Sequence, residues 1–292
     1  MRFYDLSTET EFNKDHPLWK KYVVTKAGKP REHLNAEGLR AAAGCSELFL
    51  APSVTTISNI IDGFGTFGAG AGWGKKMTLQ AVSDVGCADV KQIDLRASAL
   101  MTSARDAGTR GHMVVEGYLR HILDEANTLP AMLAADELEM AREVRAAITK
   151  YIDEDIIALE HPCCSRDYGM GGRVDILCAN TVIDLKFPEV PRKPKESEIA
   201  QVVAYARLLG MARAALFMWD RKLGKVIPYI IESKDYPVHW HVMMDGKKLF
   251  ISLVDLWLGS VEYSVYLGRQ DEGLDEECEE EESEEKATAV SF

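Results

Sequence analysis

The segment from Gly172 to Phe187 constrains the fold of this chain more than any other, because apolar and polar residues alternate on both sides of a short break. Alternation with a period of two predicts a β-strand on each side. Ala179-Asn180 can form a two-residue turn, since Asn tolerates a positive φ. This turn predicts a hairpin in which Cys178 pairs with Thr181. The same register places Asp175 opposite Asp184, on one face of the hairpin.

Two carboxylates that face each other repel, and a divalent cation between them reverses the sign of that interaction. Lys186 follows Asp184 by two residues and therefore points to the same side. The opposite face is apolar and is expected to pack on the core. Two carboxylates and a lysine are suited to metal-assisted attack on a phosphodiester, with Mg²⁺ or Mn²⁺ as the cation. The alternative is a surface strand whose charged side chains are solvated.

Composition and cysteine usage limit the class of protein. The 292 residues are 47% hydrophobic and 27% charged, as in an ordinary globular chain. There is no apolar run long enough to span a bilayer and no apolar signal segment at the N-terminus. The six cysteines form no CxxC pair. We therefore expect reduced thiols, a cytoplasmic location, no membrane association and neither structural zinc nor an iron–sulfur cluster.

The net charge of −12 is concentrated at the C-terminus. Residues 271–292 contain eleven acidic residues and one lysine, a net charge of −10, which leaves −2 for residues 1–270. A nearly neutral body permits a local basic groove. The acidic tail is expected to be disordered. It can act as a DNA mimic, bind a basic protein partner or simply aid solubility.

A glycine-rich segment imitates two nucleotide-binding motifs. Residues 63–68 match GxGxxG, but this fingerprint requires a preceding strand, and residues 57–61 look helical. Residues 70–76 resemble a Walker A loop, yet Ala69 replaces its first glycine and Lys76 its Ser or Thr. We therefore interpret the segment as a flexible loop near the substrate path.

The remaining pattern predicts helices before the hairpin and mixed elements around it. Ser53 is placed to cap a helix. Helices are predicted over 73–84, 88–105, 108–126 and 131–153, with His112 and Glu116 on one helix face. Strands are predicted at 156–160, 214–219 and 226–232, and helices at 198–209 and 239–258. Arg192, Lys193 and Lys195 lie in a Pro-rich loop suited to phosphate contacts or to a plain linker role.

The order of these motifs resembles the PD-(D/E)XK nuclease superfamily, and in particular its RecB/Cas4-like exonuclease branch. The order is Gly-Thr-x-x-His on a helix, Gly-x-x-Asp on one strand, Asp-x-Lys on the next and Gln-x-x-x-Tyr on a helix. The run from Asp184 to Tyr205 is similar to mitochondrial genome maintenance exonucleases and their phage relatives. Pro52 to Ile57 resembles an N-terminal motif of those phage enzymes.

The resemblance implies a role for each matching residue. Asp175, Asp184, His112 and the Leu185 carbonyl would bind the metal, and Lys186 would be the catalytic lysine. Gln201 and Tyr205 would support the site and contact substrate. Glu116 and Glu160 are additional candidates, and Ser53, Arg192, Lys193 and Lys195 are candidate substrate contacts. The cysteines of the Cas4 iron–sulfur cluster are absent from the C-terminal region except Cys278, and Phe187 replaces the Thr or Ser that often follows the lysine.

The sequence thus predicts an α/β (α+β) chain with a restriction-endonuclease-like core, in which helices flank a central mixed sheet, plus a helical N-terminal part. One nuclease domain is expected over 1–270, helix-rich at 53–153 and with the catalytic sheet at 155–258. The expected function is a Mg²⁺- or Mn²⁺-dependent exonuclease acting on ends of DNA, mainly single-stranded, with Tyr205 or Trp73 stacking on bases. If the chain is phage-encoded, its location is the host cytoplasm. The alternatives are an endonuclease or end processor, and a nuclease-fold binding module without turnover.

Overall fold

The computed structural model describes residues 3–22, 50–65, 90–124, 133–188 and 190–258. The chain divides into two compact units. One comprises Met1–Ile57, Pro162–Gly172 and Asp245–Phe292, and the other Ser58–His161 and Arg173–Met244. None of the helices in the described ranges is long and apolar enough to cross a bilayer. The predicted acidic tail and the glycine-rich residues 66–76 lie outside the described ranges.

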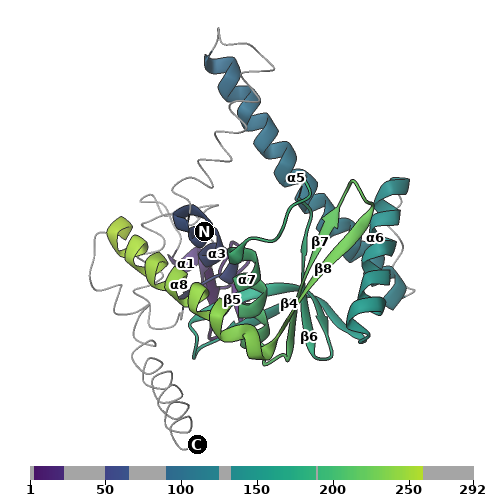
Figure 1. The fold of residues 1–292 in the computed structure, drawn as a ribbon. Coiled ribbons are helices and arrows are strands. Elements are labelled where there is room, and N and C mark those ends of the chain that lie inside the picture. Colours follow the sequence, from purple (N-terminus) through teal and green to yellow (C-terminus); the bar gives the residue numbers. More distant parts are fainter. Residues whose placement is uncertain (1–2, 23–49, 66–89, 125–132, 189, 259–292) are drawn as a thin grey trace, which may run out of the picture. The chain divides into compact units, whose positions relative to one another are not determined.

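A five-stranded mixed sheet organises the second unit (Figure 1). Its order is β4-β5-β6-β7-β8. The β5–β6 and β7–β8 pairs are antiparallel, and the β6–β7 pair is parallel. The bounds are Ile156–Ser165 for β4, Met170–Cys178 for β5, Thr181–Lys186 for β6, Arg213–Asp220 for β7 and Lys225–Glu232 for β8.

The predicted hairpin register is confirmed. Ile176 pairs with Ile183 and Leu177 with Val182, and Ala179 and Asn180 are the two residues between the strands. This register extends by count to Asp175 and Asp184. The prediction that only one face of the hairpin is buried is wrong, because Val182 on the carboxylate side is fully buried as well.

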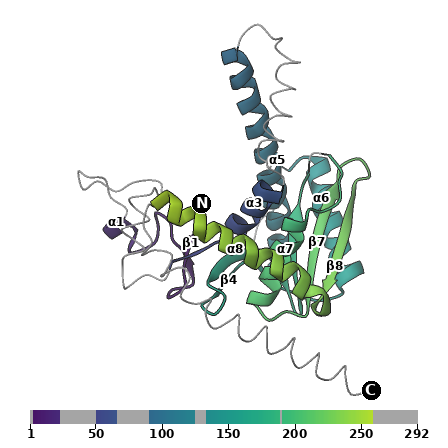
Figure 2. The same ribbon diagram turned by 60° about the vertical axis from the view of Figure 1, so that its left-hand side comes forward.

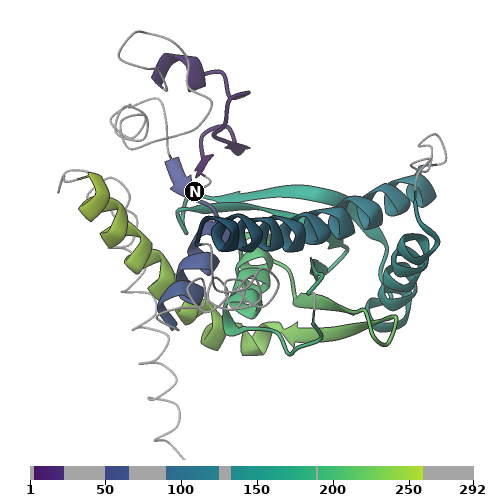
Figure 3. The same ribbon diagram turned by 90° about the horizontal axis from the view of Figure 1, so that it is seen from above.

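Helices cover both faces of this sheet (Figure 2). The face carrying Ile183 and Leu185 packs against α5 (Val90–Leu123) and α6 (Ala135–Ala147) in one apolar cluster. In Figure 3 α5 runs along the sheet, and α6 lies against its second half. The opposite face contacts α7 (Glu196–Leu208), which is buried along most of its length. The predicted mixed α/β fold, a central mixed sheet flanked by helices, is therefore present.

Several predicted boundaries need correction. The predicted break at Gly108 is wrong, because α5 runs unbroken for 34 residues, from Val90 to Leu123. A single glycine costs about 1 kcal/mol in a helix interior, and packing of the helix can offset that cost. After α6 the chain forms a π-helical turn, Ile148–Ile152, and ends the helix at Asp153 with φ 55°. The strand predicted at 156–160 extends to Ser165 as β4.

The first unit contains a small sheet that the pattern did not predict. Its order is β2-β1-β3, with β1 at Phe3–Asp5, β2 at Thr10–Glu11 and β3 at Leu50–Pro52. A short helix α1 covers Trp19–Tyr22. Phe3 packs on Phe250, with ring centroids 5.9 Å apart. Strands of two or three residues are too short to show an alternation in sequence.

Two helices contain residues of both units. The first, α3 (Val54–Gly65), begins as predicted at Ser53, whose Oγ accepts a hydrogen bond from the Thr56 N–H at 3.0 Å. Because a helix and not a strand runs into residues 63–65, the match to GxGxxG is not a dinucleotide fingerprint. The second helix, α8, covers Tyr236–Leu258 after a 3₁₀ turn at Ser233–Asp235.

Candidate active site

Asp175 on β5 connects the hairpin to α5. Its Oδ2 accepts a hydrogen bond from the Leu185 N–H at 2.7 Å and lies 3.4 Å from Nδ1 of His112. The His112 ring also meets the Phe187 ring edge to face, with centroids 5.1 Å apart. The imidazole thus contacts Asp175 on β5 and Phe187, the residue that directly follows β6.

The approach of α5 to β6 requires a glycine at position 111. A Cβ on Gly111 would lie 2.6 Å from Cγ of Phe187, closer than any normal contact. The absence of a side chain therefore lets the helix backbone meet the aromatic ring. It also sets the next residue, His112, beside Asp175.

Lys186 at the end of β6 stands between a carboxylate and an amide. Its Nζ lies 2.6 Å from Oδ2 of Asp184 and donates a hydrogen bond to Oε1 of Gln201 at 3.2 Å. Gln201 in turn donates from Nε2 to the Tyr205 hydroxyl at 3.1 Å. The i, i+4 spacing on α7 makes this relay possible, and it fixes the position of the ammonium group.

Tyr205 is only 2% exposed, and its hydroxyl is taken up by Gln201. The expectation that Tyr205 stacks on bases is therefore wrong. The side chain fits the supporting role alone. Trp73, the other aromatic proposed for stacking, lies outside the described residues.

Asp184 is 3% exposed and carries an incompletely satisfied oxygen. Among the described residues, its Oδ2 has no hydrogen-bond partner of acceptable geometry, although the Lys186 ammonium is close. A buried carboxylate oxygen without a hydrogen bond is costly. Oδ2 of Asp184 can therefore accept one further positively charged partner.

The electrostatics of the four ionisable groups are mutually dependent. Burial raises the pKa of Asp184, and the nearby Lys186 only partly opposes it. Burial acts in the same direction on Asp175, but His112 and Lys186 outweigh it and lower the pKa of this carboxyl. Burial disfavours the charged forms of His112 and Lys186, yet the two carboxylates raise the pKa of both cations.

The donor types fit a hard divalent cation. Across the described residues, no three His, Cys, Asp or Glu side chains gather closely enough to enclose a metal ion by themselves. Mg²⁺ does not need such a cage, because it is usually bound by one or two carboxylates and completes its octahedron with water and phosphate oxygens. Asp175, Asp184 and a main-chain carbonyl are ligands of that kind, and the unsatisfied oxygen of Asp184 is an available one.

Glu160 and Glu116 are adjacent to this group but already have partners. Glu160 lies on β4 with φ 52°, an unusual value for a non-glycine residue, and pairs with Arg173 at 2.7 Å. Burial and the Asp175 carboxylate raise the pKa of Glu160. Glu116 pairs with Arg120 one turn along α5 at 2.8 Å. Glu160 is therefore the better placed of the two to influence Asp175.

The three loop cations are all exposed, and Arg192 also forms an ion pair. Arg192 binds both carboxylate oxygens of Glu198, at 2.5 and 2.7 Å, so this guanidinium anchors the loop to α7. The Lys195 N–H donates to the same carboxylate at 2.9 Å. The side chains of Lys193 and Lys195 are exposed. Ser53 is 2% exposed, belongs to the first unit and caps α3.

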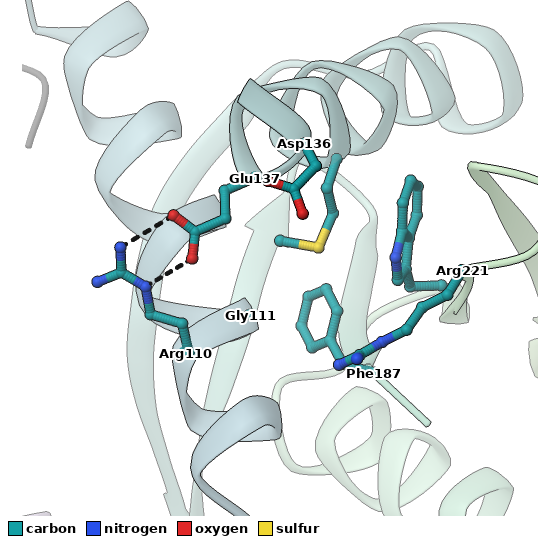
Figure 4. A pocket seen from close by; sticks show the side chains of 8 residues that line it. Arg110, Gly111, Asp136, Glu137, Phe187 and Arg221 are labelled. Carbon is teal, nitrogen blue, oxygen red and sulfur yellow. Dashed lines mark hydrogen bonds and ion pairs between the residues drawn. The ribbon is translucent and has the colours of Figure 1, made fainter. Parts of the chain in front are cut away.

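A pocket of about 340 Å³ opens beside the site, between α5, α6 and the ends of β6 and β7 (Figure 4). Phe187, Trp219 and Arg221 contribute to its wall. No sequence motif pointed to Trp219 or Arg221 as site residues. Trp219 lies near the end of β7 and Arg221 directly follows it, and only the parallel pairing of β7 with β6 brings them beside Phe187. The one signal in the sequence was an aromatic residue at the end of a predicted strand, followed closely by a cation.

Comparisons with known proteins give weak structural likenesses. No family model matches the chain, and no curated protein matches it. It is similar to an alkaline exonuclease (LHK-Exo) from Laribacter hongkongensis, with 17% identity and a TM-score of 0.31 over 56% of this chain and 93% of that one. The same enzyme in complex with dAMP gives 16% identity and a TM-score of 0.31. A structure called SSO0001 gives 14% identity and a TM-score of 0.26, covering 48% of this chain and 74% of that one.

Proposed function

We propose that this protein is a divalent-metal-dependent nuclease that hydrolyses phosphodiester bonds in DNA. The observation that carries the proposal is the placement of Lys186. Its ammonium group lies between the Asp184 carboxylate and Gln201, at the end of a strand pair that also presents Asp175 beside His112. A half-buried lysine held by a carboxylate and an amide is a positioned positive charge, which can stabilise the negative charge that develops in phosphoryl chemistry.

The chain's own residues supply three functions in this proposal. Asp175 and Asp184 would hold the cation, with His112 oriented by Asp175 at the edge of the same group. A divalent cation bound there supplies positive charge to the phosphate and makes water more acidic. Lys186 stabilises negative charge that develops on the phosphate and orients the attacking water. Gln201 and Tyr205 keep the ammonium group in place.

DNA ends are the proposed substrate, and the motif order supports this choice. The run from Asp184 to Tyr205 resembles exonucleases of the RecB/Cas4-like branch, and Lys193 and Lys195 place positive charge at the surface, where backbone phosphates would pass. Mg²⁺ or Mn²⁺ is the proposed cofactor. An acidic tail at 271–292 that binds a basic protein partner is the second proposed interaction.

A digestion series tests the proposal. The full chain is incubated with 5′- and 3′-labelled single strands, duplexes and single-stranded circles, in Mg²⁺, in Mn²⁺ or in EDTA. We expect linear single strands to be shortened from an end in either metal and to survive in EDTA. Degradation of single-stranded circles at the same rate as linear strands would indicate an endonuclease and not an exonuclease. Survival of every substrate while DNA is still bound would identify a binding module without turnover.

A further inference from the structure

The pocket beside Lys186 has aromatic and aliphatic walls. Phe187, Trp219 and Met140 all line it, and Figure 4 shows it from close by. Both rings are half-buried, so each keeps exposed surface for a ligand. At about 340 Å³ the pocket is at the small end of the range for ligand sites, with room for one nucleoside and not for a run of strand.

The charged side chains at its rim fall into two kinds. Arg110 donates to both oxygens of Glu137, at 2.8 and 2.9 Å, and this pair forms one side of the rim. Asp136 and Arg221 are different, because among the described residues neither makes a hydrogen bond or an ion pair. Both are exposed. The rim therefore offers one uncommitted acceptor and one uncommitted donor beside the aromatic walls.

The pocket and the proposed active site share parts of their walls. Phe187 directly follows Lys186, and its ring contacts that of His112. Gly111 lines the pocket and directly precedes His112. A ligand between Phe187 and Trp219 would thus meet two residues, Gly111 and Phe187, that are the sequence neighbours of the proposed site residues His112 and Lys186. A nucleotide has that extent, with a planar base at one end and a phosphate at the other.

We propose that this pocket binds the base of the nucleotide next to the scissile phosphate, stacked against Phe187 and Trp219, with Asp136 and Arg221 contacting its polar edge. The inference rests on the proposed nuclease function and extends it. Every base has a π-face, so stacking tolerates any sequence. Base edges carry both donors and acceptors, which match the uncommitted carboxylate and guanidinium.

Binding of oligonucleotides with and without a terminal base tests the proposal. The Asp184→Asn variant is used so that the DNA survives, and the dissociation constant is measured by fluorescence anisotropy. We expect an abasic residue at one of the two ends to weaken binding about fivefold to 150-fold, equivalent to a stacking loss of about 1–3 kcal/mol. Adding Trp219→Ala should remove this difference between the two oligonucleotides. The exposed Tyr151 serves as the control, since Tyr151→Ala should leave it intact.

Two further variants keep the test valid if Trp219→Ala does not fold. Arg221→Gln and Asp136→Asn change exposed side chains, and each should reduce the preference for a terminal base at least twofold. Equal binding of the two oligonucleotides at both ends would overturn the proposal. So would a preference that Trp219→Ala, or both rim substitutions, left unchanged.

Calorimetry with a free deoxynucleoside 5′-monophosphate separates this inference from the function on which it rests. Cleavage of DNA without any base preference in binding would support the proposed nuclease function and contradict the proposed base pocket. The protein could instead bind the mononucleotide in a way that depends on Trp219 and yet cleave no DNA under any metal condition. That result would support the proposed base pocket and contradict the proposed nuclease function.

Discussion

The residues that set the chemistry of the site differ in how deeply their side chains are buried. Asp184 and Tyr205 are buried, whereas His112 and Lys186 keep part of their side chains accessible, at 33% and 22%. His112 and Lys186 can therefore contact a substrate, whereas Asp184 and Tyr205 help to position the Lys186 ammonium group. Sequence reasoning named these residues, but the depth of each depends on α7 covering the carboxylate face. The sequence of the hairpin does not indicate that α7 packs on this face.

His112 provides a prediction at this scale. His112→Ala removes the ring that contacts both Asp175 and Phe187. We expect a rise in the metal concentration needed for half-maximal cleavage of about 10-fold to 100-fold, the cost typical of weakening a metal site's immediate surroundings. Titration of cleavage rate against Mn²⁺ measures it. The exposed neighbour provides the control, because Met113→Ala should leave the metal requirement unchanged. If His112→Ala needs the same metal concentration as the wild type, His112 does not contribute to metal binding.

Elements, and not isolated residues, decide how closely the parts of the site approach. Gly111 lets α5 contact Phe187, whereas a Cβ on Gly108 would meet no atom within 4 Å. The two glycines are one turn apart on the same helix, so they form a matched pair. The sequence predicts a helix break at Gly108, and no local pattern distinguishes Gly111 from it. The distinction depends on Phe187, which is remote in sequence.

The pair of glycines yields a prediction of opposite signs. Gly108→Ala should stabilise the protein by about 0.5–1 kcal/mol, because alanine favours the helix and nothing obstructs its methyl group. Gly111→Ala should destabilise it by about 1–3 kcal/mol, since α5 or Phe187 must shift. Urea unfolding of both variants measures the difference. Equal stabilisation by the two substitutions would show that α5 does not lie against Phe187.

The turn between β5 and β6 is held by a second carboxylate. Glu154 accepts hydrogen bonds from the Asn180 N–H at 2.7 Å and the Thr181 hydroxyl at 3.0 Å, and it pairs with Arg213. Burial opposes its ionisation, but these three partners outweigh burial and lower the pKa of Glu154. The hairpin register could be predicted from alternation and the turn residues. This clamp could not, because Arg213 comes from β7.

A pH dependence of stability follows from the lowered pKa. The unfolded chain binds a proton at Glu154 near pH 4.3, and the folded chain only at lower pH. The stabilisation is therefore complete above about pH 5 and is lost as the pH falls through the folded-state pKa. Glu154→Gln should cost about 1–3 kcal/mol at pH 7 and progressively less toward pH 3. Thermal unfolding at several pH values measures this. A penalty that stays constant with pH would show that the charge does not contribute.

At the scale of the whole molecule, charge is distributed unevenly along the chain. Residues 271–292 carry −10 of the net −12. If this segment restrains a DNA-binding groove, its deletion should raise the cleavage rate several-fold at low salt and reduce the salt dependence. If it only aids solubility, both quantities should stay unchanged. Comparing the full chain with a chain ending at residue 270, over a salt series, decides between the two. Sequence alone left both open.

Replacement of Lys186 tests the central claim most directly. Lys186→Met keeps an unbranched side chain one atom shorter and removes the ammonium group between Asp184 and Gln201. Lys225→Met, at an exposed position on β8, is the matched control. We predict that Lys186→Met lowers the rate of cleavage of labelled single-stranded DNA at least 10² to 10³-fold, roughly the loss expected for one preorganised electrostatic group, while DNA binding persists. Lys225→Met should cleave as the wild type does. Wild-type cleavage by Lys186→Met would contradict the account.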